Sequence, residues 1–249
     1  MTIVMGYMRA NAPPEDDLVH ARQLADQMAV ALSNSSLIDE LDQLNWGTLK
    51  ALARTVDAKS AWTAGHSERV LELSMRIADP LGLSPQERQI LHRGALLHDI
   101  GKVGIPNRVL DKPSRLSSEE FDLIKLHPGI GARILEPIKA YEEVIPLVHQ
   151  HHERFDGTGY PLGLSGETIH LGARILTVAD VFDAMLSNRP YRIGLALDDV
   201  VNTIKQGEGK QFDPAVVKAF LSVLWTDDGI LDIWESPSSL ERQGMQSCG

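Results

Sequence analysis

Residues His98-Asp99-Ile100-Gly101-Lys102 place a histidine beside an aspartate near the end of an expected helix. Neighbouring positions on a helical turn lie about 100° apart, so this pair offers one nitrogen and one carboxylate ligand from a single turn. Two ligands do not hold a metal ion firmly, so further ligands have to come from other parts of the chain. The stretch therefore predicts a metal centre that distant segments complete.

Further candidate ligands recur at intervals of about one helical hairpin. They are His66 in Gly-His-Ser-Glu-Arg-Val, His127 in Lys-Leu-His-Pro-Gly, the adjacent pair His151 and His152, and Asp180 in Val-Ala-Asp-Val-Phe-Asp. Antiparallel helices of a bundle can direct such ligands at one centre. Five imidazoles and two carboxylates suit two divalent ions about 3.5–4 Å apart, with Asp99 as the bridging carboxylate. A nitrogen and oxygen set without thiolate favours iron or manganese, with zinc or nickel as second choices.

Hydrophobic residues at helical spacing predict an all-α fold. Helices are expected over residues 18–44, 46–79, 84–98, 118–126, 130–135, 142–152, 171–187, 197–206 and 213–224. The helix that follows Ser84 begins with a capping box, because Glu87 occupies its third position. Residues 103–116 are expected to form a loop, and residues 2–7 a short β-branched strand.

Composition limits the classes of partner. The chain has 34 acidic and 24 basic residues and a formal net charge of −10, whereas proteins that bind DNA or RNA polymers are usually basic. No apolar run reaches the roughly 18 residues of a membrane span, and the start lacks a basic-then-apolar signal pattern. The single cysteine, Cys248, excludes an internal disulfide framework. We therefore expect a cytoplasmic protein with no nucleic-acid polymer as partner and no membrane insertion.

Residues 1–45 differ from the rest of the chain, because a short strand is followed by a long amphipathic helix rich in leucine. This stretch resembles the final strand and C-terminal helix of a GAF sensor domain, which implies an upstream sensor domain. The alternative is an N-terminal helix that packs on its own domain. In either case the helix predicts a homodimer seam.

Three strings together resemble the HD-GYP family, a bacterial branch of the HD metal-dependent phosphohydrolases. They are His98–Lys102, His-His-Glu-Arg-Phe-Asp-Gly-Thr-Gly-Tyr-Pro from His151 to Pro161, and Ala-Asp-Val-Phe-Asp-Ala-Met from Ala179 to Met185. The resemblance covers residues 46–225 and implies an HD-type helical bundle that holds two or three metal ions and hydrolyses cyclic di-GMP. Residues 226–249 are expected to form a C-terminal tail, in which residues 236–249 are polar and expected to be disordered.

The resemblance also implies roles for individual residues. The seven candidate ligands fall on the family's metal positions, and Lys102 falls on its phosphate-contacting lysine. Asp183 falls on a nearby acidic position. Arg189 and Arg192, in Asn-Arg-Pro-Tyr-Arg, match basic positions that face the substrate.

The residues themselves leave alternatives for two of these roles. Lys102 follows His98 by four positions, so the two share a face if the helix continues, and the ammonium can then neutralise a phosphate oxygen. The alternative is a surface lysine stabilised by the helix dipole. Asp183 either orients a ligand or the attacking water, or is an exposed helix carboxylate.

The loop Gly157–Pro161 also has two interpretations. Glycine lets a backbone approach a ligand closely, so Gly159, Tyr160 and Pro161 are predicted to contact a guanine or phosphate, with Tyr160 stacking on a base. The alternative is a structural turn that positions His151 and His152, and one loop can do both.

One departure from the family pattern changes the expected metal count. Family members with a third metal carry a glutamate four residues before the position of His66, where this chain has Trp62. An indole does not ligate metal, so the sequence predicts two ions.

The function expected from these observations is a two-metal phosphodiesterase. A metal-bridging hydroxide attacks phosphorus opposite the departing ribose 3′ oxygen, with Asp99 bridging the metals and Lys102 holding the phosphate. The products are pGpG and, after a second cut, GMP. Two alternatives remain: a module that binds cyclic di-GMP or a partner protein with little or no catalysis, and a phosphohydrolase of another nucleotide.

Overall fold

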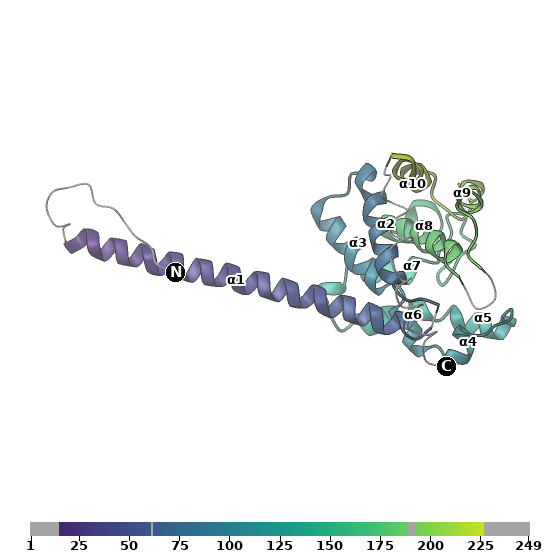
Figure 1. Ribbon diagram of the computed structural model, residues 1–249, viewed down its shortest axis with the longest axis horizontal. Helices are drawn as coiled ribbons and strands as arrows, with labels where there is room; N and C mark the ends of the chain where they lie inside the picture. Colours follow the sequence, from purple (N-terminus) through teal and green to yellow (C-terminus); the bar gives the residue numbers. More distant parts are fainter. Residues whose placement is uncertain (1–14, 61, 189–192, 227–249) are drawn as a thin grey trace, which may run out of the picture. The chain divides into compact units, whose positions relative to one another are not determined.

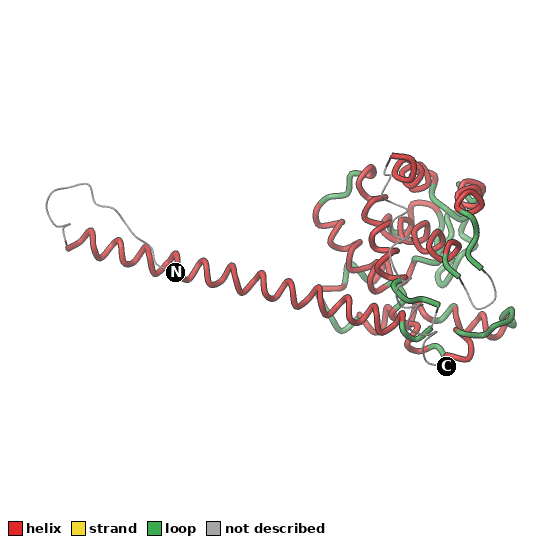
Figure 2. Tube along the Cα trace, in the orientation of Figure 1, coloured by secondary structure: helices red, strands yellow, loops and turns green. Residues whose placement is uncertain are grey.

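The computed structural model of this chain describes residues 15–60, 62–188 and 193–226, and these residues form an all-α fold (Figures 1 and 2). The α-helices are α1 (Glu15–Asp57), α2 (His66–Leu81), α3 (Pro85–Leu97), α4 (Asn107–Leu110), α5 (Ser118–Ile124), α6 (His127–Leu135), α7 (Ile145–Gln150), α8 (Leu171–Leu186), α9 (Leu197–Gln206) and α10 (Pro214–Thr226). Short 3-10 turns are η1 (Ile100–Gly104), η2 (Lys139–Tyr141) and η3 (Gly166–Thr168). No strand occurs within these ranges, so the predicted all-α class is confirmed.

The chain divides into two compact units, Met1–Thr48 and Leu49–Gly249. In the first unit, the described residues form one continuous helix with exposed apolar side chains, among them Leu24 and Leu41. The predicted strand 2–7 and the tail beyond residue 226 lie outside the described residues. The domain boundaries at residues 45 and 225 stay predictions. Among the helices described, none is both long and apolar enough to cross a membrane.

Helix α2 lies at the centre of the second unit, where α3, α8 and α10 pack against it. Its residues Val70, Leu73 and Ile77 are fully buried and recur at helical spacing, so one apolar stripe faces the core. Helix α8 is apolar on most of its surface and is buried between its neighbours, with Phe182 against Phe220 of α10 at a centroid distance of 5.0 Å. This packing fixes α2 and α8, the helices that carry the first and the last ligand candidate along the chain, His66 and Asp180.

A close backbone contact between η1 and α6 aligns two of the motif segments. A Cβ atom on Gly101 would lie 1.9 Å from the carbonyl oxygen of His127, so only glycine fits at this position. A Cβ atom on Gly131 would lie 2.8 Å from Cγ1 of Val148, which is also too close without a shift of that side chain. The glycine of the His-Asp-Ile-Gly-Lys stretch therefore brings Asp99 and His127 to the same region.

Two sequence predictions are wrong: the unbroken helix over 46–79 and the loop without helix over 103–116. The helix expected over 46–79 is broken between Asp57 and His66, because Gly65 adopts a left-handed φ of 70° and the carboxylate of Asp57 accepts hydrogen bonds from the backbone N–H and hydroxyl of Ser67. The helix expected over 84–98 is confirmed as α3, and it passes into the 3-10 turn η1, so the condition that the helix continues to Lys102 is not met. The loop expected over 103–116 contains the short helix α4.

Candidate metal centre

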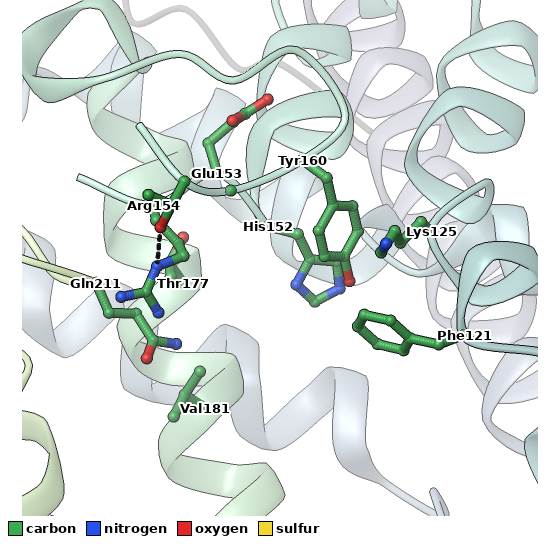
Figure 3. A pocket seen from close by; sticks show the side chains of 11 residues that line it. Phe121, Lys125, His152, Glu153, Arg154, Tyr160, Thr177, Val181 and Gln211 are labelled. Atoms are coloured by element: carbon green, nitrogen blue, oxygen red, sulfur yellow. Dashed lines mark hydrogen bonds between the residues drawn. The ribbon is translucent and has the colours of Figure 1, made fainter. Parts of the chain in front are cut away.

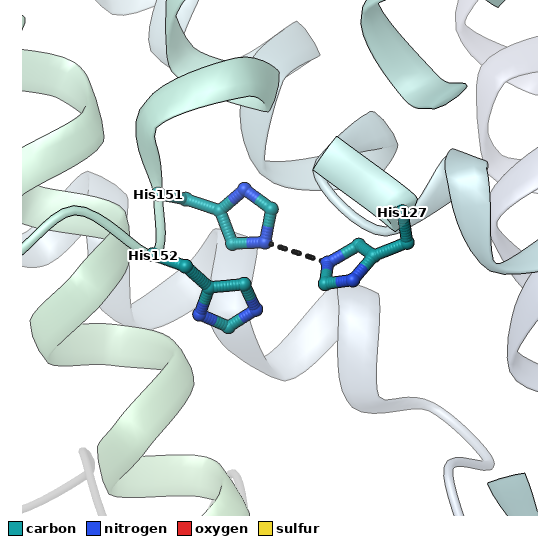
Figure 4. Close-up of side chains that lie close together, drawn as sticks. All are labelled: His127, His151 and His152. Carbon is teal, nitrogen blue, oxygen red and sulfur yellow. Dashed lines mark hydrogen bonds between the residues drawn. The ribbon is translucent and has the colours of Figure 1, made fainter. Parts of the chain in front are cut away.

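The structure brings the seven candidate ligands into one buried cluster formed by α2, α3, α6, α7 and α8. Six of them form two groups of three in which the ligand atoms lie within 4.8 Å of one another. We call His127, His151 and His152 the nitrogen triad, and His66, His98 and Asp180 the mixed triad. Figure 4 shows the nitrogen triad, in which the Nε2 atoms of His127 and His151 are 3.2 Å apart.

Asp99 lies between the two triads. Its Oδ1 is 3.3 Å from Nε2 of His127, in the nitrogen triad. Its Oδ2 is 3.4 Å from Nε2 of His98 and 3.6 Å from Nε2 of His66, in the mixed triad. Each carboxylate oxygen therefore faces one triad, which is the arrangement that a carboxylate shared by two ions requires.

Three of the histidines are oriented by the same local device. Nδ1 of His98, His127 and His151 lies 2.7–2.8 Å from the carbonyl oxygen of the residue three positions earlier, at the end of a helix or turn. The carbonyl accepts the Nδ1 proton, which leaves the lone pair on Nε2. All three Nε2 atoms point into the cluster, which is the form in which imidazole binds metal.

His66 is oriented by a carboxylate instead. Its Nδ1 lies 2.6 Å from Oδ2 of Asp183, which is completely buried. Arg69, one turn after His66 on α2, donates from Nε to Oδ1 of Asp183 at 2.5 Å and from Nη2 to Oδ2 at 3.1 Å. Asp183 is thus placed to orient a ligand, and the interpretation as an exposed helix carboxylate is wrong.

The two triads differ in charge. Burial lowers the pKa of His127 to about 3 and that of His152 to about 4, and it lowers the pKa of His151 as well. The pKa of His66 is raised well above its ordinary value: burial opposes the charged form, but the hydrogen bonds that His66 donates to Asp180, Asp183 and Asp99 outweigh it.

The carboxylates of the centre are ionised. Burial tends to raise the pKa of Asp99, but chiefly the positive charge of Lys102 holds it well below its ordinary value. The pKa of Asp180 is likewise well below its ordinary value, because its hydrogen bond to His66 outweighs burial. The nitrogen triad therefore consists of neutral imidazoles, whereas the mixed triad combines imidazoles with the anionic carboxylate of Asp180.

The donor set fits divalent metal ions. Nε2 of His98 is buried without a hydrogen-bond partner among the described residues, an arrangement that costs free energy unless a ligand satisfies it. Nitrogen and carboxylate ligands without thiolate suit iron, manganese or zinc. The structure therefore contains His/Asp clusters that can hold metal ions.

Lys102 approaches the centre from a 3-10 turn and not from a continuation of the helix that ends before His98. It lies in η1, three residues after Asp99, and its Nζ is 2.5 Å from Oδ2 of that aspartate. Its side chain is 23% exposed, so the ammonium borders both the buried cluster and solvent. This position is suited to a group that meets a substrate at the rim of the centre.

The loop after His152 is held by a buried carboxylate. Glu153 is 1% exposed and accepts hydrogen bonds from the backbone N–H groups of Leu162 at 2.6 Å and Leu164 at 3.1 Å. A Cβ on Gly159 would lie 2.3 Å from the backbone nitrogen of Arg154, so glycine is required where the loop returns to the His-His-Glu segment. The loop is therefore fixed to the segment that carries two of the candidate ligands.

A cavity of about 440 Å³ opens beside the nitrogen triad (Figure 3). Tyr160 packs on His152 with ring centroids 5.0 Å apart, and Phe121 meets Tyr160 edge to face at 6.3 Å. The lining residues are Phe121, Lys125, His152, Glu153, Arg154, Thr158, Gly159, Tyr160, Thr177, Val181 and Gln211. Aromatic faces beside cationic groups are suited to a nucleotide.

The predicted substrate contacts are only partly within the described residues. Gly159 and Tyr160 line the cavity. Pro161 follows Tyr160 through a cis peptide bond. Arg189 and Arg192 lie outside the described residues, and their roles stay predictions. Trp62 is 41% exposed.

Sequence reasoning missed several residues around the centre. Arg69 stands three positions after His66, a spacing that shares a helix face and could have indicated the pair. The backbone contacts of Glu153 carry no signal in the sequence, because they depend on tertiary structure. Phe121 lies in α5 and Lys125 is the C-cap residue of this helix. No motif connects this segment to the site.

Comparisons with known proteins agree with the fold. The HD domain family model matches residues 50–216. The cyclic di-GMP phosphodiesterase response regulator RpfG of Xanthomonas campestris is 39% identical over 212 residues, which cover 82% of this chain and 56% of that protein. The 3′3′-cGAMP-specific phosphodiesterase 3 of Vibrio cholerae is 41% identical over 177 residues, 70% of this chain and 38% of that protein. The chain thus spans about half or less of the length of these relatives.

A solved structure is also similar. An HDG"Y"P protein from Bdellovibrio bacteriovorus matches with a TM-score of 0.54 and 26% identity, over 64% of this chain and 51% of that one. The family match covers more than half of the sequence and includes all seven candidate ligands. The chain belongs to the HD domain family, and its His-His-Glu and Gly-Tyr-Pro motifs make it a member of the HD-GYP branch.

Proposed function

We propose that this chain is a metal-dependent phosphodiesterase that hydrolyses cyclic di-GMP to pGpG, and further to GMP by a second cut. The observation that carries the proposal is the position of Asp99, whose two oxygens each face a separate triad of ligand atoms. A binding module has no physical need for two triads joined by a shared carboxylate. The names of the similar proteins, which include cyclic di-GMP phosphodiesterases, support the same reaction.

Two metal ions per chain would be held by the nitrogen triad and the mixed triad, with Asp99 shared. Iron or manganese suits this donor set best, with zinc or nickel as alternatives. Bound divalent ions supply a water-derived nucleophile near neutral pH and stabilise negative charge on phosphate oxygens. Trp62 in place of a carboxylate supports a count of two.

The chain's own residues then bind and orient the substrate. Lys102, at the rim of the cluster, donates to a phosphate oxygen and stabilises the charge that develops there. Tyr160 provides an aromatic face for a base, and Gly159 allows the backbone to approach it. Asp183 keeps the ring of His66 in position through its Nδ1 contact.

The substrate class is a 3′–5′-linked cyclic dinucleotide, and one observation favours a second candidate within it. A relative with 41% identity is named a 3′3′-cGAMP-specific phosphodiesterase. The cavity beside Tyr160 accepts a base by stacking, which does not distinguish guanine from adenine. Cyclic di-GMP is the first candidate because that name occurs for the relative matched over 82% of this chain.

The remaining proposals concern partners and location. The exposed apolar side chains of the first unit support a homodimer through the helix of residues 15–48. An upstream sensor domain and a cytoplasmic location complete the proposal. Light scattering on the full chain and on a variant with Leu37 and Leu41 changed to lysine tests the seam. A dimer that survives both substitutions contradicts it.

The reaction is tested by product analysis. Protein reconstituted anaerobically with ferrous iron or manganese is incubated with cyclic di-GMP, 3′3′-cGAMP and cyclic di-AMP in parallel, and metals are counted by elemental analysis. We expect pGpG, followed by GMP, with about two ions per chain. A fully loaded protein that binds cyclic di-GMP without forming product is a binding module. Hydrolysis of cGAMP alone moves the proposal to that substrate.

A further inference from the structure

The turn that carries Lys102 is tied to a residue that no motif includes. Nζ of Lys59 donates hydrogen bonds to the backbone carbonyl oxygens of Lys102 at 2.9 Å, Val103 at 2.8 Å and Ile105 at 2.8 Å. Lys59 lies in the second unit, two residues after the end of α1. Among the described residues its ammonium forms no ion pair with a carboxylate.

These three carbonyls lie in or directly after η1, at the end of a helical turn, where the last carbonyl acceptors lack partners within the turn. The carbonyl of Lys102 also accepts from the backbone N–H of Ile105. An ammonium has three donors, and Lys59 directs all three at this one segment. Hydrogen bonds from a charged donor are stronger than neutral ones. This geometry fixes a backbone segment, whereas a surface lysine that pairs with a carboxylate does not.

The opposite side of the same turn is also fixed. Gly101 lies against the backbone of α6 so closely that no Cβ fits. The backbone N–H of Lys102 donates to the carbonyl of Asp99 at 2.9 Å, and that of Ile105 donates to the carbonyl of Lys102 at 3.0 Å. The backbone from which the Lys102 side chain extends is therefore held between α6 and Lys59.

We infer that Lys59 is a positioning residue that places Lys102 for its contact with the substrate phosphate. This inference rests on the proposed function, because Lys102 matters in this way only if a phosphate binds at the rim of the centre. Lys59 itself touches neither a candidate ligand nor the cavity. Since it lies two residues after the end of α1, it also connects the segment after that helix to the turn beside the metal centre.

The first test is substitution in the full chain loaded with metal. Lys59→Met keeps the length and apolar stem of the side chain but removes the donors. We expect kcat/KM for the cyclic dinucleotide to fall by about 10- to 100-fold, because a reacting group that moves by about 1 Å loses catalysis on that scale. Lys59→Arg, which retains donors to carbonyls, should recover part of the loss. Lys218→Met on α10 removes an equal charge from an exposed position and should have no effect.

The second test asks whether Lys59 acts through Lys102. In a Lys102→Ala background, Lys59→Met should cost less than threefold, because the group that it positions is absent. Losses that multiply in the double variant overturn the inference, and so does full activity of Lys59→Met. Loss of metal from Lys59→Met, measured by elemental analysis, would show that Lys59 supports the metal ligands and would contradict the inference that it positions Lys102.

Hydrogen exchange provides a readout that does not depend on turnover. The amides of Lys102 and Ile105 should exchange about tenfold faster in Lys59→Met than in wild type and Lys218→Met. If wild-type protein hydrolyses no cyclic dinucleotide, the proposed function fails. The exchange rates still report whether Lys59 stabilises the turn that carries Lys102. Unchanged exchange in Lys59→Met shows that the turn does not depend on Lys59 and overturns the inference in either case.

Discussion

The nitrogen triad and the mixed triad occupy the same buried cluster but are built in opposite ways. In the nitrogen triad, burial keeps the imidazoles neutral, with the pKa of His127 at about 3 and that of His152 at about 4. In the mixed triad, surrounding carboxylates raise the pKa of His66. Backbone carbonyls orient His127 and His151, whereas a side-chain network orients His66.

This difference shows how one fold can offer two unlike sites side by side. A neutral set of nitrogens binds a cation through coordination alone. In a set with ionised carboxylates, the bound cation also neutralises their buried negative charge. We therefore expect the two sites to differ in affinity and in the spectrum of a bound ion. Asp99, which faces both triads, is the group on which both sites depend.

The largest effect is expected from Asp99→Ala, because this change removes the one group that the two triads share. Hydrolysis of cyclic di-GMP should fall by about 10³-fold or more, and the metal content should fall below two per chain. Product analysis and elemental analysis measure the two effects. Asp39→Ala, an exposed carboxylate on α1, is the control. Two retained ions with full activity would show that Asp99 is no bridge.

Removing one member of each triad should separate the two sites. His151→Ala should leave one ion in the mixed triad, and His98→Ala one ion in the nitrogen triad, each with activity lowered by about 100-fold or more. With cobalt as the probe, the visible spectra of the two variants should differ. The mixed triad with Asp99 offers two imidazoles and two carboxylates, whereas the nitrogen triad with Asp99 offers three imidazoles and one carboxylate. If either substitution releases both ions, the triads bind metal as a unit, which contradicts their description as two separate sites.

Most of the fold and the ligand candidates could be predicted from the sequence. Helical periodicity indicated the all-α class, and histidines at the ends of successive helices indicated that they converge. His98, His127 and His151 share a local geometry in which Nδ1 meets a carbonyl three residues earlier. Such contacts follow from position at the end of a helix or turn, so local sequence already contains them.

The surroundings of the centre could not be predicted in the same way. The break between α1 and α2 depends on Asp57 reaching Ser67 and on the left-handed conformation of Gly65, which periodicity does not record. The side chain of Lys102 approaches Asp99 from a 3-10 turn, since the helix that would have aligned it with His98 ends earlier. These features depend on contacts between segments distant in the sequence.

A moderate effect confined to the mixed triad is expected from Asp183→Asn. An amide can keep the shape of the carboxylate, but it does not stabilise the Nδ1 proton of His66 in the same way, and it breaks the charge pair with Arg69. Metal affinity should fall by about 10- to 100-fold at one site only. Titration with cobalt measures both sites. Ser187→Ala, which removes a hydroxyl 3.5 Å from the same carboxylate, is the control. An equal loss of metal affinity at both sites would contradict the expectation that Asp183 affects the mixed triad only.

The smallest effect is expected from Glu153→Gln, which acts beside the nitrogen triad without removing a ligand. The glutamine oxygen can accept from only one of the backbone N–H groups of Leu162 and Leu164, so the loop that carries Tyr160 loosens. A hydrogen bond to a charged group contributes about 1.5–3 kcal/mol, and we expect KM for cyclic di-GMP to rise about tenfold while both ions stay bound. Steady-state kinetics with elemental analysis measure this. Glu167→Gln, on η3, is the control. If Glu153→Gln releases an ion, the loop supports His152 as a ligand, and the nitrogen triad also depends on side-chain contacts beyond the backbone.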